Sequence, residues 1–504
     1  MKKLFCFLIF ASLALASLVG CSLNHEHSYG EWEISKEANC TENGIEARYC
    51  KCGRSETREI DKVIGAHVYD NADDGVCNIC DRSRVSEGLA YVINSDGASC
   101  TITGKGSFIG HDIFIPTVID GYTVTAIGQH AFENQGYINS IYIPTTVKSI
   151  GIYAFSQCRS LTTVNIPDGI TSIGEYTFSD CEMLKDVVIP ESVTAIDSYA
   201  FSGCSTIKSI SLPSRVSSIG DYAFSYCAAL KELIIPESLT EIGQFAFYNC
   251  TSISALTIPD SVKSIGEGVF CGCKEMTSIS LPSTISKISN AAFYECNALE
   301  KISIPDSVTI IGDSAFRNCN SITEVSIGKN ISLIGEQAFS RCTSLVSIKV
   351  DEANPNYMSI DGNLYTKDGN TLIQYAIGKA DESFVIPDSV TEIGVSAFKK
   401  CDALKSITIP DSVTDIKNSA FYMCTSLTEM TLPDSVTNIE TWAFYGCTAL
   451  KTLVIPDSVV TVGADIVFYC YYVTVYCEAE EKPEGWNESW AYEKCRIIWG
   501  YTEG

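Results

Sequence analysis

Cysteine recurs along this chain at one fixed interval. A constant period of this length is the signature of a solenoid, in which each short unit cannot bury its apolar residues alone and stacks on its neighbours. The repeat therefore constrains the fold of most of the 504 residues. Thirteen cysteines form the ladder, and all but one of their intervals are 23 residues: Cys158, Cys181, Cys204, Cys227, Cys250, Cys273, Cys296, Cys319, Cys342, Cys401, Cys424, Cys447 and Cys470.

The unit between two successive cysteines has a regular apolar pattern. Between Cys181 and Cys204, apolar residues alternate up to Ile189, a proline follows, and an Ala-Phe pair stands at 200–201. Alternation predicts a short β-strand, which the proline ends because it has no N–H to donate to a ladder. We expect a second extended stretch at 193–196, a helical turn at the Ala-Phe pair, and a phenylalanine that fills the interior.

The repeat resembles a known family when it is written out as C-x-x-L-x-x-V-x-I-P-x-S-V-x-x-I-x-x-x-A-F-x-x-C. It is similar to the leucine-rich repeat of BspA-like bacterial surface proteins. The resemblance implies a repeat solenoid, mainly β with short helical turns, of about sixteen rungs with parallel strands on the concave face. Relatives are described as adhesins that bind matrix proteins such as fibronectin or fibrinogen, so it also implies adhesion or protein–protein interaction.

The first twenty residues have the pattern of an export signal. Two lysines precede an apolar run from Leu4 to Leu18, which is short for a membrane span. The segment ends in Leu-Val-Gly-Cys21, which resembles the lipobox of bacterial lipoproteins, where the cysteine carries the lipid. We expect lipidation at Cys21 and an exported, membrane-anchored protein exposed at the cell surface. A plain secretory signal with a chance cysteine is the alternative.

Histidine and cysteine are concentrated between residues 21 and 86. The segment contains a C-x-x-C knuckle at 77–80 and a C-x-C pair at 50–52, and it is similar to small His/Cys modules in surface proteins of anaerobic bacteria. Thiolates and imidazoles suit a tetrahedral zinc site, whereas in an oxidising compartment the same thiols would pair as disulfides. The sequence leaves both open. The candidate zinc ligands are Cys40, Cys50, Cys52, Cys77, Cys80, His27 and His67.

The spacing of the ladder breaks once, between Cys342 and Cys401. Two apolar stretches there flank a Lys-Asp-Gly-Asn turn at 367–370, which predicts a β-hairpin. The hairpin is either a recognition feature or a decoration that covers one rung. The expected organisation is a signal peptide at 1–20, a His/Cys module at 21–86, an N-terminal cap at 87–112, a solenoid at 113–476 with its insert at about 351–384, and a C-terminal cap at 477–504 in which Cys477 and Cys495 are candidates to pair.

Two rows of polar residues follow the repeat. Small residues, most of them hydroxylic, occupy outward strand positions, where they either contact a ligand or serve as ordinary exposed strand residues. A row of acids follows the strand-ending proline, and we expect turn chemistry there rather than calcium binding. The candidate ligand-facing residues are Asn165, Ser211, Thr257, Ser280, Ser303, Ser326, Thr408 and Thr431, and the acids are Asp168, Glu191, Glu237, Asp260, Asp306, Asp388, Asp411, Asp434 and Asp457.

The overall charge narrows the possible partners. Sixty-one acidic residues against 35 basic ones give a net charge of −26, which disfavours nucleic acid and anionic membrane surfaces, so membrane contact is expected only through the lipid. His111 and His130, the only histidines after residue 67, lie in no nucleophile or metal pattern, and we expect no enzyme. The partner is then a host matrix or other cell-surface protein, or alternatively a cell-envelope glycan.

The chemistry of the ladder follows from its geometry. Neighbouring cysteines would lie one strand spacing apart, but their parallel Cβ vectors suit disulfide formation poorly, and thirteen thiols cannot pair completely. We predict buried, mostly free thiols that act as small apolar side chains with weak S–H donors.

Overall fold

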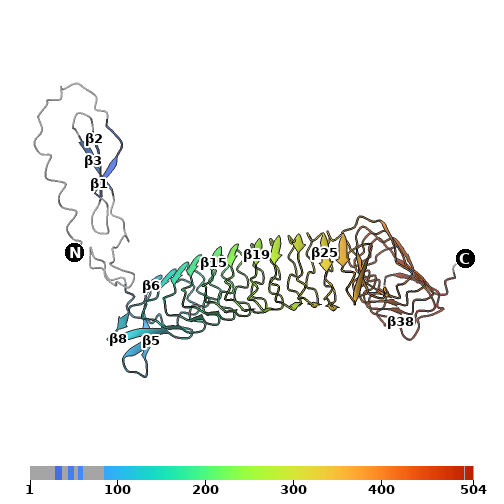
Figure 1. Ribbon diagram of the computed structural model, residues 1–504, viewed down its shortest axis with the longest axis horizontal. Helices are drawn as coiled ribbons and strands as arrows, with labels where there is room; N and C mark the ends of the chain where they lie inside the picture. The colour runs from blue at the N-terminus through green and yellow to red at the C-terminus, as the bar shows by residue number, and fades with distance from the viewer. Residues whose placement is uncertain (1–28, 37–43, 50–54, 61–84, 493, 503–504) are drawn as a thin grey trace, which may run out of the picture. The chain divides into compact units, whose positions relative to one another are not determined.

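The computed structural model describes residues 29–36, 44–49, 55–60, 85–492 and 494–502, and it divides into two units, 1–85 and 86–504 (Figure 1). Cys21 and all seven candidate zinc ligands lie outside the described residues. The described part of the chain has no helix that is long and apolar enough to cross a membrane.

The described part of the first unit is an antiparallel sheet of β1 (Glu33–Lys36), β2 (Gly44–Tyr49) and β3 (Ser55–Ile60). The guanidinium groups of Arg48 and Arg58 lie 4.7 Å and 4.5 Å from the ring centroid of Trp32. Each arginine also pairs with a glutamate on the neighbouring strand, Arg48 with Glu56 and Arg58 with Glu46. Cation–π contacts and ion pairs therefore connect the strands of this small sheet.

The second unit is a β-solenoid of about 17 turns with parallel strands (Figure 1). Each regular turn contributes one strand to each of two rows. The first row contains β6 (Asp112–Phe114), β9 (Ser140–Tyr142), β11 (Thr163–Asn165), β13 (Asp186–Val188), β15 (Ser209–Ser211), β17 (Glu232–Ile234), β19 (Ala255–Thr257), β21 (Ser278–Ser280), β23 (Lys301–Ile302), β25 (Glu324–Ile327), β27 (Ser347–Val350), β31 (Ser383–Val385), β33 (Ser406–Thr408), β35 (Glu429–Thr431), β37 (Thr452–Ile455), β39 (Thr474–Cys477) and β40 (Arg496–Ile498).

The second row lies on the other side of each turn, and all its strands except β8 and β30 are only two residues long. It contains β8 (Tyr122–Ile127), β10 (Ser149–Ile150), β12 (Ser172–Ile173), β14 (Ala195–Ile196), β16 (Ser218–Ile219), β18 (Glu241–Ile242), β20 (Ser264–Ile265), β22 (Lys287–Ile288), β24 (Ile310–Ile311), β26 (Leu333–Ile334), β30 (Thr371–Gln374), β32 (Glu392–Ile393), β34 (Asp415–Ile416), β36 (Asn438–Ile439) and β38 (Thr461–Val462).

Parallel pairing keeps equivalent positions of the repeat in register. Ile196 pairs with Ile219, Ile219 with Ile242, and Ile242 with Ile265 along the second row. All four isoleucines are buried in one continuous core. Hydroxyl groups add bonds between turns: Ser238 Oγ, for example, donates to the Val216 carbonyl at 2.6 Å. Because the sequence repeats with a single period, equivalent side chains of successive turns lie in parallel rows along the array.

The expected helical turn at each Ala-Phe pair is wrong: the described residues contain no helix. In the turn that contains Phe201, Tyr199 has φ 58° and Gly203 has φ 77°. Residues in this left-handed region interrupt an α-helix on both sides of the Ala-Phe pair. The chain forms turns instead, and the phenylalanines stack in the core, with the Phe201 and Phe224 ring centroids 5.5 Å apart and nearly parallel.

The ladder cysteines are buried and free. Their thiols donate to the main-chain carbonyl of the phenylalanine 26 residues earlier, as from Cys250 Sγ to Phe224 O at 3.0 Å. Twelve of the thirteen make this bond: Cys158, Cys181, Cys204, Cys227, Cys250, Cys273, Cys296, Cys319, Cys342, Cys424, Cys447 and Cys470. Cys401 is the exception. The carbonyl 26 residues before it, Tyr375 O, accepts instead from Gln374 Nε2 at 2.8 Å.

The insert divides the core of the solenoid. Strands β28 (Tyr357–Ile360), β29 (Asn363–Thr366) and β30 pair antiparallel, and β30 then pairs parallel with β32 in the second row. Leu364 belongs to the apolar cluster of the preceding turns, whereas Tyr365 belongs to that of the following turns. Because adjacent side chains of a strand point to opposite faces, β29 separates two cores and supplies a side chain to each.

Additional strands cover the two ends of the array. At the first end β4 (Ala90–Ile93) and β5 (Ser99–Gly104) form a hairpin whose strand β5 pairs with β8, and β8 also pairs with β10 and with β7 (Val118–Ile119). At the second end Trp486 and Trp490 are buried, and Trp486 Nε1 donates to Val459 O at 3.0 Å.

The expected pairing of Cys477 with Cys495 is not present, because both are free. Tyr476 is in register with Ile498 in the parallel pair β39–β40, so Cys477 is aligned close to residue 499. Cys495 is therefore displaced along the strand direction by several residues, which puts the two thiols beyond disulfide reach.

We predict that native protein reacts slowly with thiol reagents and that unfolding in the absence of reductant exposes the seventeen free cysteines of the described residues. Burial raises the pKa of Cys158, Cys227 and Cys342 to about 12, so these three thiols carry almost no thiolate at neutral pH. Ellman titration before and after denaturation measures both states. A thiol count near zero in the unfolded protein would contradict this prediction.

Candidate functional site

The outward side chains of the first strand row form the broadest repeated surface of the array. Ser211, Thr257, Ser280, Ser303, Ser326, Thr408 and Thr431 are exposed, as expected for ligand-facing positions. Register places them in one line, with Thr257 opposite Ser280 and Ser326 opposite Lys349. We call this line of outward residues on the first row the strand face.

Asn165 is the exception among the predicted positions. It is half-buried, and its side-chain amide bonds to the main chain of the previous turn, with Nδ2 donating to Ile143 O and Oδ1 accepting from Ile143 N, each at 2.7 Å. These two bonds add to the main-chain pairing of β11 with β9. The Asn165 side chain is therefore occupied by the fold rather than presented to a ligand.

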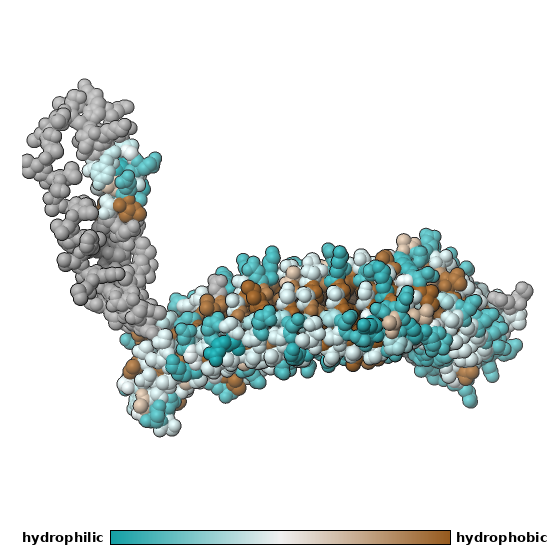
Figure 2. Space-filling view, in the orientation of Figure 1, coloured by the Kyte–Doolittle hydropathy of each residue, from teal (hydrophilic) through white to brown (hydrophobic). Residues whose placement is uncertain are grey.

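Three apolar residues also belong to the strand face. Val188, Ile234 and Val385 are 78%, 72% and 67% exposed, unusually open for large aliphatic side chains. Val188 stands opposite Asn165 in the register, Ile234 opposite Ser211, and Val385 opposite Thr408. The sequence analysis did not single out Val385, although counting back 23 residues from Thr408 finds it. Figure 2 shows hydrophobic residues at intervals among polar ones along this side of the array.

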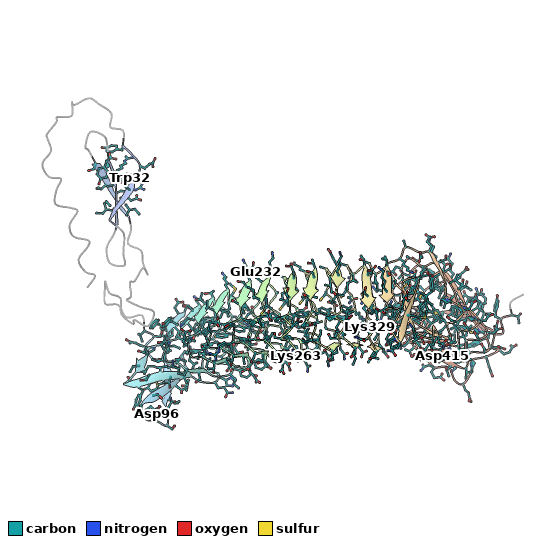
Figure 3. All side chains as sticks on the ribbon, viewed as in Figure 1. Trp32, Asp96, Glu232, Lys263, Lys329 and Asp415 are labelled. Atoms are coloured by element: carbon teal, nitrogen blue, oxygen red, sulfur yellow. The ribbon has the colours of Figure 1, made fainter. Side chains whose placement is uncertain are left out.

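The charged residues beside the strand face are mainly exposed. Glu232 begins β17 and points outward on the first-row side, whereas Lys263 lies on the opposite side, next to the second row (Figure 3). Lys349 is paired with Glu324 at 2.6 Å. The strand face thus combines hydroxyl groups, separated aliphatic side chains and mixed charge, which is a surface composition suited to protein contacts.

A shallow groove along the second strand row is mainly acidic. Its lining includes the carboxylates of Glu175, Asp197, Asp221, Glu241 and Glu267, with Lys287 as its one cation among the described residues. Burial and the neighbouring Glu175 raise the pKa of Asp197. Crowded carboxylates repel one another, so this groove favours a basic partner.

Two of the nine acids that follow the strand-ending prolines, Glu191 and Asp260, accept hydrogen bonds from the next turn. Asp260 Oδ1 accepts from the main-chain N–H of Ser283 at 2.6 Å, and Glu191 Oε2 accepts from Ser214 N–H at 3.1 Å and from its hydroxyl at 2.9 Å. In the part of the chain that the structure describes, no group of three or more His, Cys, Asp or Glu side chains is placed to hold a metal ion.

The histidines are also engaged in structural contacts. His111 Nδ1 lies 2.8 Å from the Tyr137 carbonyl. His130 pairs with Glu133 at 2.7 Å, and its ring stacks on Tyr153 at 4.9 Å. That stack continues through Tyr176 and Tyr199 at ring spacings of 4.5 Å. The rings cover each other's faces, so they rigidify one edge of the array rather than offer an open stacking platform.

We predict that calcium does not change the thermal stability of the protein, because the best-placed carboxylates already accept main-chain and hydroxyl donors. Melting temperatures measured with excess CaCl₂ and with a calcium chelator should agree within about 1 °C, since a ligand stabilises only a state that binds it. A calcium-dependent rise of several degrees would show that the acidic row binds the ion.

Comparison with known proteins places this architecture among bacterial repeat proteins. The sequence model of the BspA type leucine rich repeat region, which comprises six copies, matches residues 125–254, 240–367 and 378–484. Among curated proteins, none matches the chain.

Solved structures of leucine-rich repeat proteins are similar to this one. A leucine-rich repeat protein from Bacteroides ovatus is 28% identical, with a TM-score of 0.53, and the match covers 82% of this chain and 99% of that one. A leucine rich cell surface protein from Faecalibacterium prausnitzii is 26% identical, with a TM-score of 0.44, and the match covers 83% of this chain and 94% of that one.

Proposed function

Because this chain belongs to the BspA-type leucine-rich repeat family, we propose that it is a bacterial surface protein that binds another protein through its strand face. Leucine-rich repeat proteins generally mediate protein–protein interactions, and the family is typically non-enzymatic. The export pattern of residues 1–20 and the lipobox-like cysteine at 21 support export and attachment of the chain by a lipid.

The observation that carries this proposal is the exposure of Val188, Ile234 and Val385 on the strand face. Each of their strands pairs in register with a neighbour of the first row, and the strand face lies across these pairs, so it presents side chains rather than an open sheet edge. Aliphatic side chains gain free energy when a partner covers them, and the small hydroxylic residues between them allow close approach. A matrix protein or another cell-surface protein fits this surface.

A glycan of the cell envelope is the second candidate, and the composition of the strand face favours it less. Aromatic rings are the side chains that stack on sugar faces. In the tyrosine stack described above, however, the rings cover one another's faces. The net charge of −26 also makes a neutral or basic partner preferable to an anionic polymer.

We predict that the double variant Val188→Asp, Ile234→Asp weakens retention by a protein ligand about tenfold or more, because two carboxylates replace contact surface. Binding of the purified protein to immobilised fibronectin, fibrinogen and cell-wall polysaccharide measures the effect. Val460→Asp is the matched control, since Val460 is 62% exposed but lies next to β38 in the second row. Retention by polysaccharide alone, or equal binding by the strand-face variant, would refute the proposal.

A further inference from the structure

The strand pairing of the first row is interrupted at several places, one of which lies between β17 and β19. Strand β17 pairs with β15, and β19 pairs with β21, but no ladder joins β17 to β19 among the described strands. Leu233, the inward residue of β17, is only partly buried, whereas its equivalents Ile210 and Leu256 are 3% and 6% exposed. The strand face is therefore open at this place, and part of the core beneath it is accessible.

A hollow of about 560 Å³ lies at this opening. Ile234, which is 72% exposed, supplies an aliphatic wall. In the next two turns the outward residues Thr257 and Ser280 are small and hydroxylic, and they face each other in the register. Glu237, which follows the strand-ending proline of the same turn as Ile234, also lines the hollow. An aliphatic wall, hydroxyl groups and a carboxylate thus meet at one depression of the strand face.

Glu237 is the only titratable residue that lines this hollow in the part of the chain that the structure describes. Its equivalents Glu191 and Asp260 accept hydrogen bonds from Ser214 and Ser283 of the next turn. For Glu237 the equivalent position of the next turn is occupied by Asp260, whose side chain has no proton to donate at neutral pH. The Glu237 carboxylate is therefore not engaged by the fold, and it remains available to a cation.

Two other hollows beside the first row already contain cations. Lys208 and Lys231 line one of them together with two glutamates. Lys349, which is paired with a glutamate, lines the other. The hollow beside Ile234 differs from both, because its single charge is negative. A partner that covers it must bring the cation itself.

We propose that the hollow beside Ile234 receives a lysine or arginine side chain of the protein partner. The aliphatic stem of this side chain lies against Ile234 and Leu233, and its charged end group donates to the Glu237 carboxylate. The hydroxyls of Thr257 and Ser280 are acceptors for its remaining N–H groups. The inference rests on the proposed protein-binding function of the strand face, and it specifies the chemistry of the partner at one point of that face.

Other side chains fit the hollow less well. A purely aliphatic side chain would cover Ile234 but would also remove water from Glu237 without replacing its hydrogen bonds, which is costly. An acidic side chain would be repelled by Glu237 and by the chain as a whole, whose net charge is −26. A basic side chain with a long stem satisfies both the aliphatic wall and the carboxylate.

Peptide selection on the full-length protein tests this proposal. A displayed library of short random peptides is selected at physiological ionic strength on the wild type, Glu237→Gln, Ile234→Ala and Glu429→Gln. Glu429→Gln is the matched control, because Glu429 is an exposed residue of β35 in the same row and its replacement removes the same charge. Any enrichment of basic peptides that reflects only the overall charge is then equal in Glu237→Gln and Glu429→Gln. Circular dichroism verifies the fold of each variant.

The affinities of selected peptides are then measured, together with those of versions in which the basic residue is replaced by norleucine. Norleucine keeps an aliphatic stem and lacks the charge, so this change and Glu237→Gln form a double-mutant cycle. We expect an excess of lysine or arginine in peptides selected on the wild type and on Glu429→Gln. Norleucine should weaken binding to these two proteins about three- to fivefold, the effect of an exposed ion pair, and should leave binding to Glu237→Gln unchanged.

Selected peptides without an excess of basic residues, or an equal effect of norleucine in the wild type and in Glu237→Gln, would overturn the proposal. If such peptides still bind Ile234→Ala more weakly than the wild type, the strand face binds protein through other contacts, and the proposed function stands. Peptides that bind all four proteins equally, or a selection that enriches no peptide, would overturn both.

Discussion

The structure depends on the closure of each turn against the next by a repeated set of hydrogen bonds. Parallel strands pair at an interval of 23 residues, and twelve of the thirteen ladder thiols donate to a carbonyl 26 residues earlier. A buried carbonyl needs its partners in every turn, so the residue that satisfies it must recur with the same period. The cysteine spacing is the visible result, and the thiol is small enough to be buried in the core while still providing a donor.

Because the turns repeat in this way, equivalent surface residues of successive turns also lie in rows. A residue on the strand face, such as Thr257, has an equivalent neighbour one turn away, and the same holds for acids such as Glu241 in the second-row groove. A repeated surface offers many similar weak contacts, which suits a broad protein partner better than one small molecule. A binding site that occurs only once in the array is therefore expected where the 23-residue repeat is interrupted.

The sequence analysis could predict the repeated features because each has its own periodic signal. Spacing and alternation were sufficient for the solenoid, its strands, the buried cysteines and exposed positions such as Ser280. The turns were different: Tyr199 and Gly203 adopt left-handed conformations, and a tyrosine at φ 58° has no composition signal that distinguishes it from a helical residue. Asn165 was misassigned for a similar reason, since only coordinates show that its amide bonds to the previous turn.

At the insert, the local sequence predicts the positions of residues in space less well than anywhere else in the array. Arg317 and Lys399 are 82 positions apart in the numbering, yet both follow a stacked phenylalanine and stand on opposite sides of Ala376. Counting by 23 fails across this region, because Gln374 and Tyr375 resume the row only after β28, β29 and most of β30 have intervened. Arg317 and Lys399 instead contact the tyrosine rings on their far sides, Tyr294 and Tyr422, and lie in different turns on either side of two small buried residues.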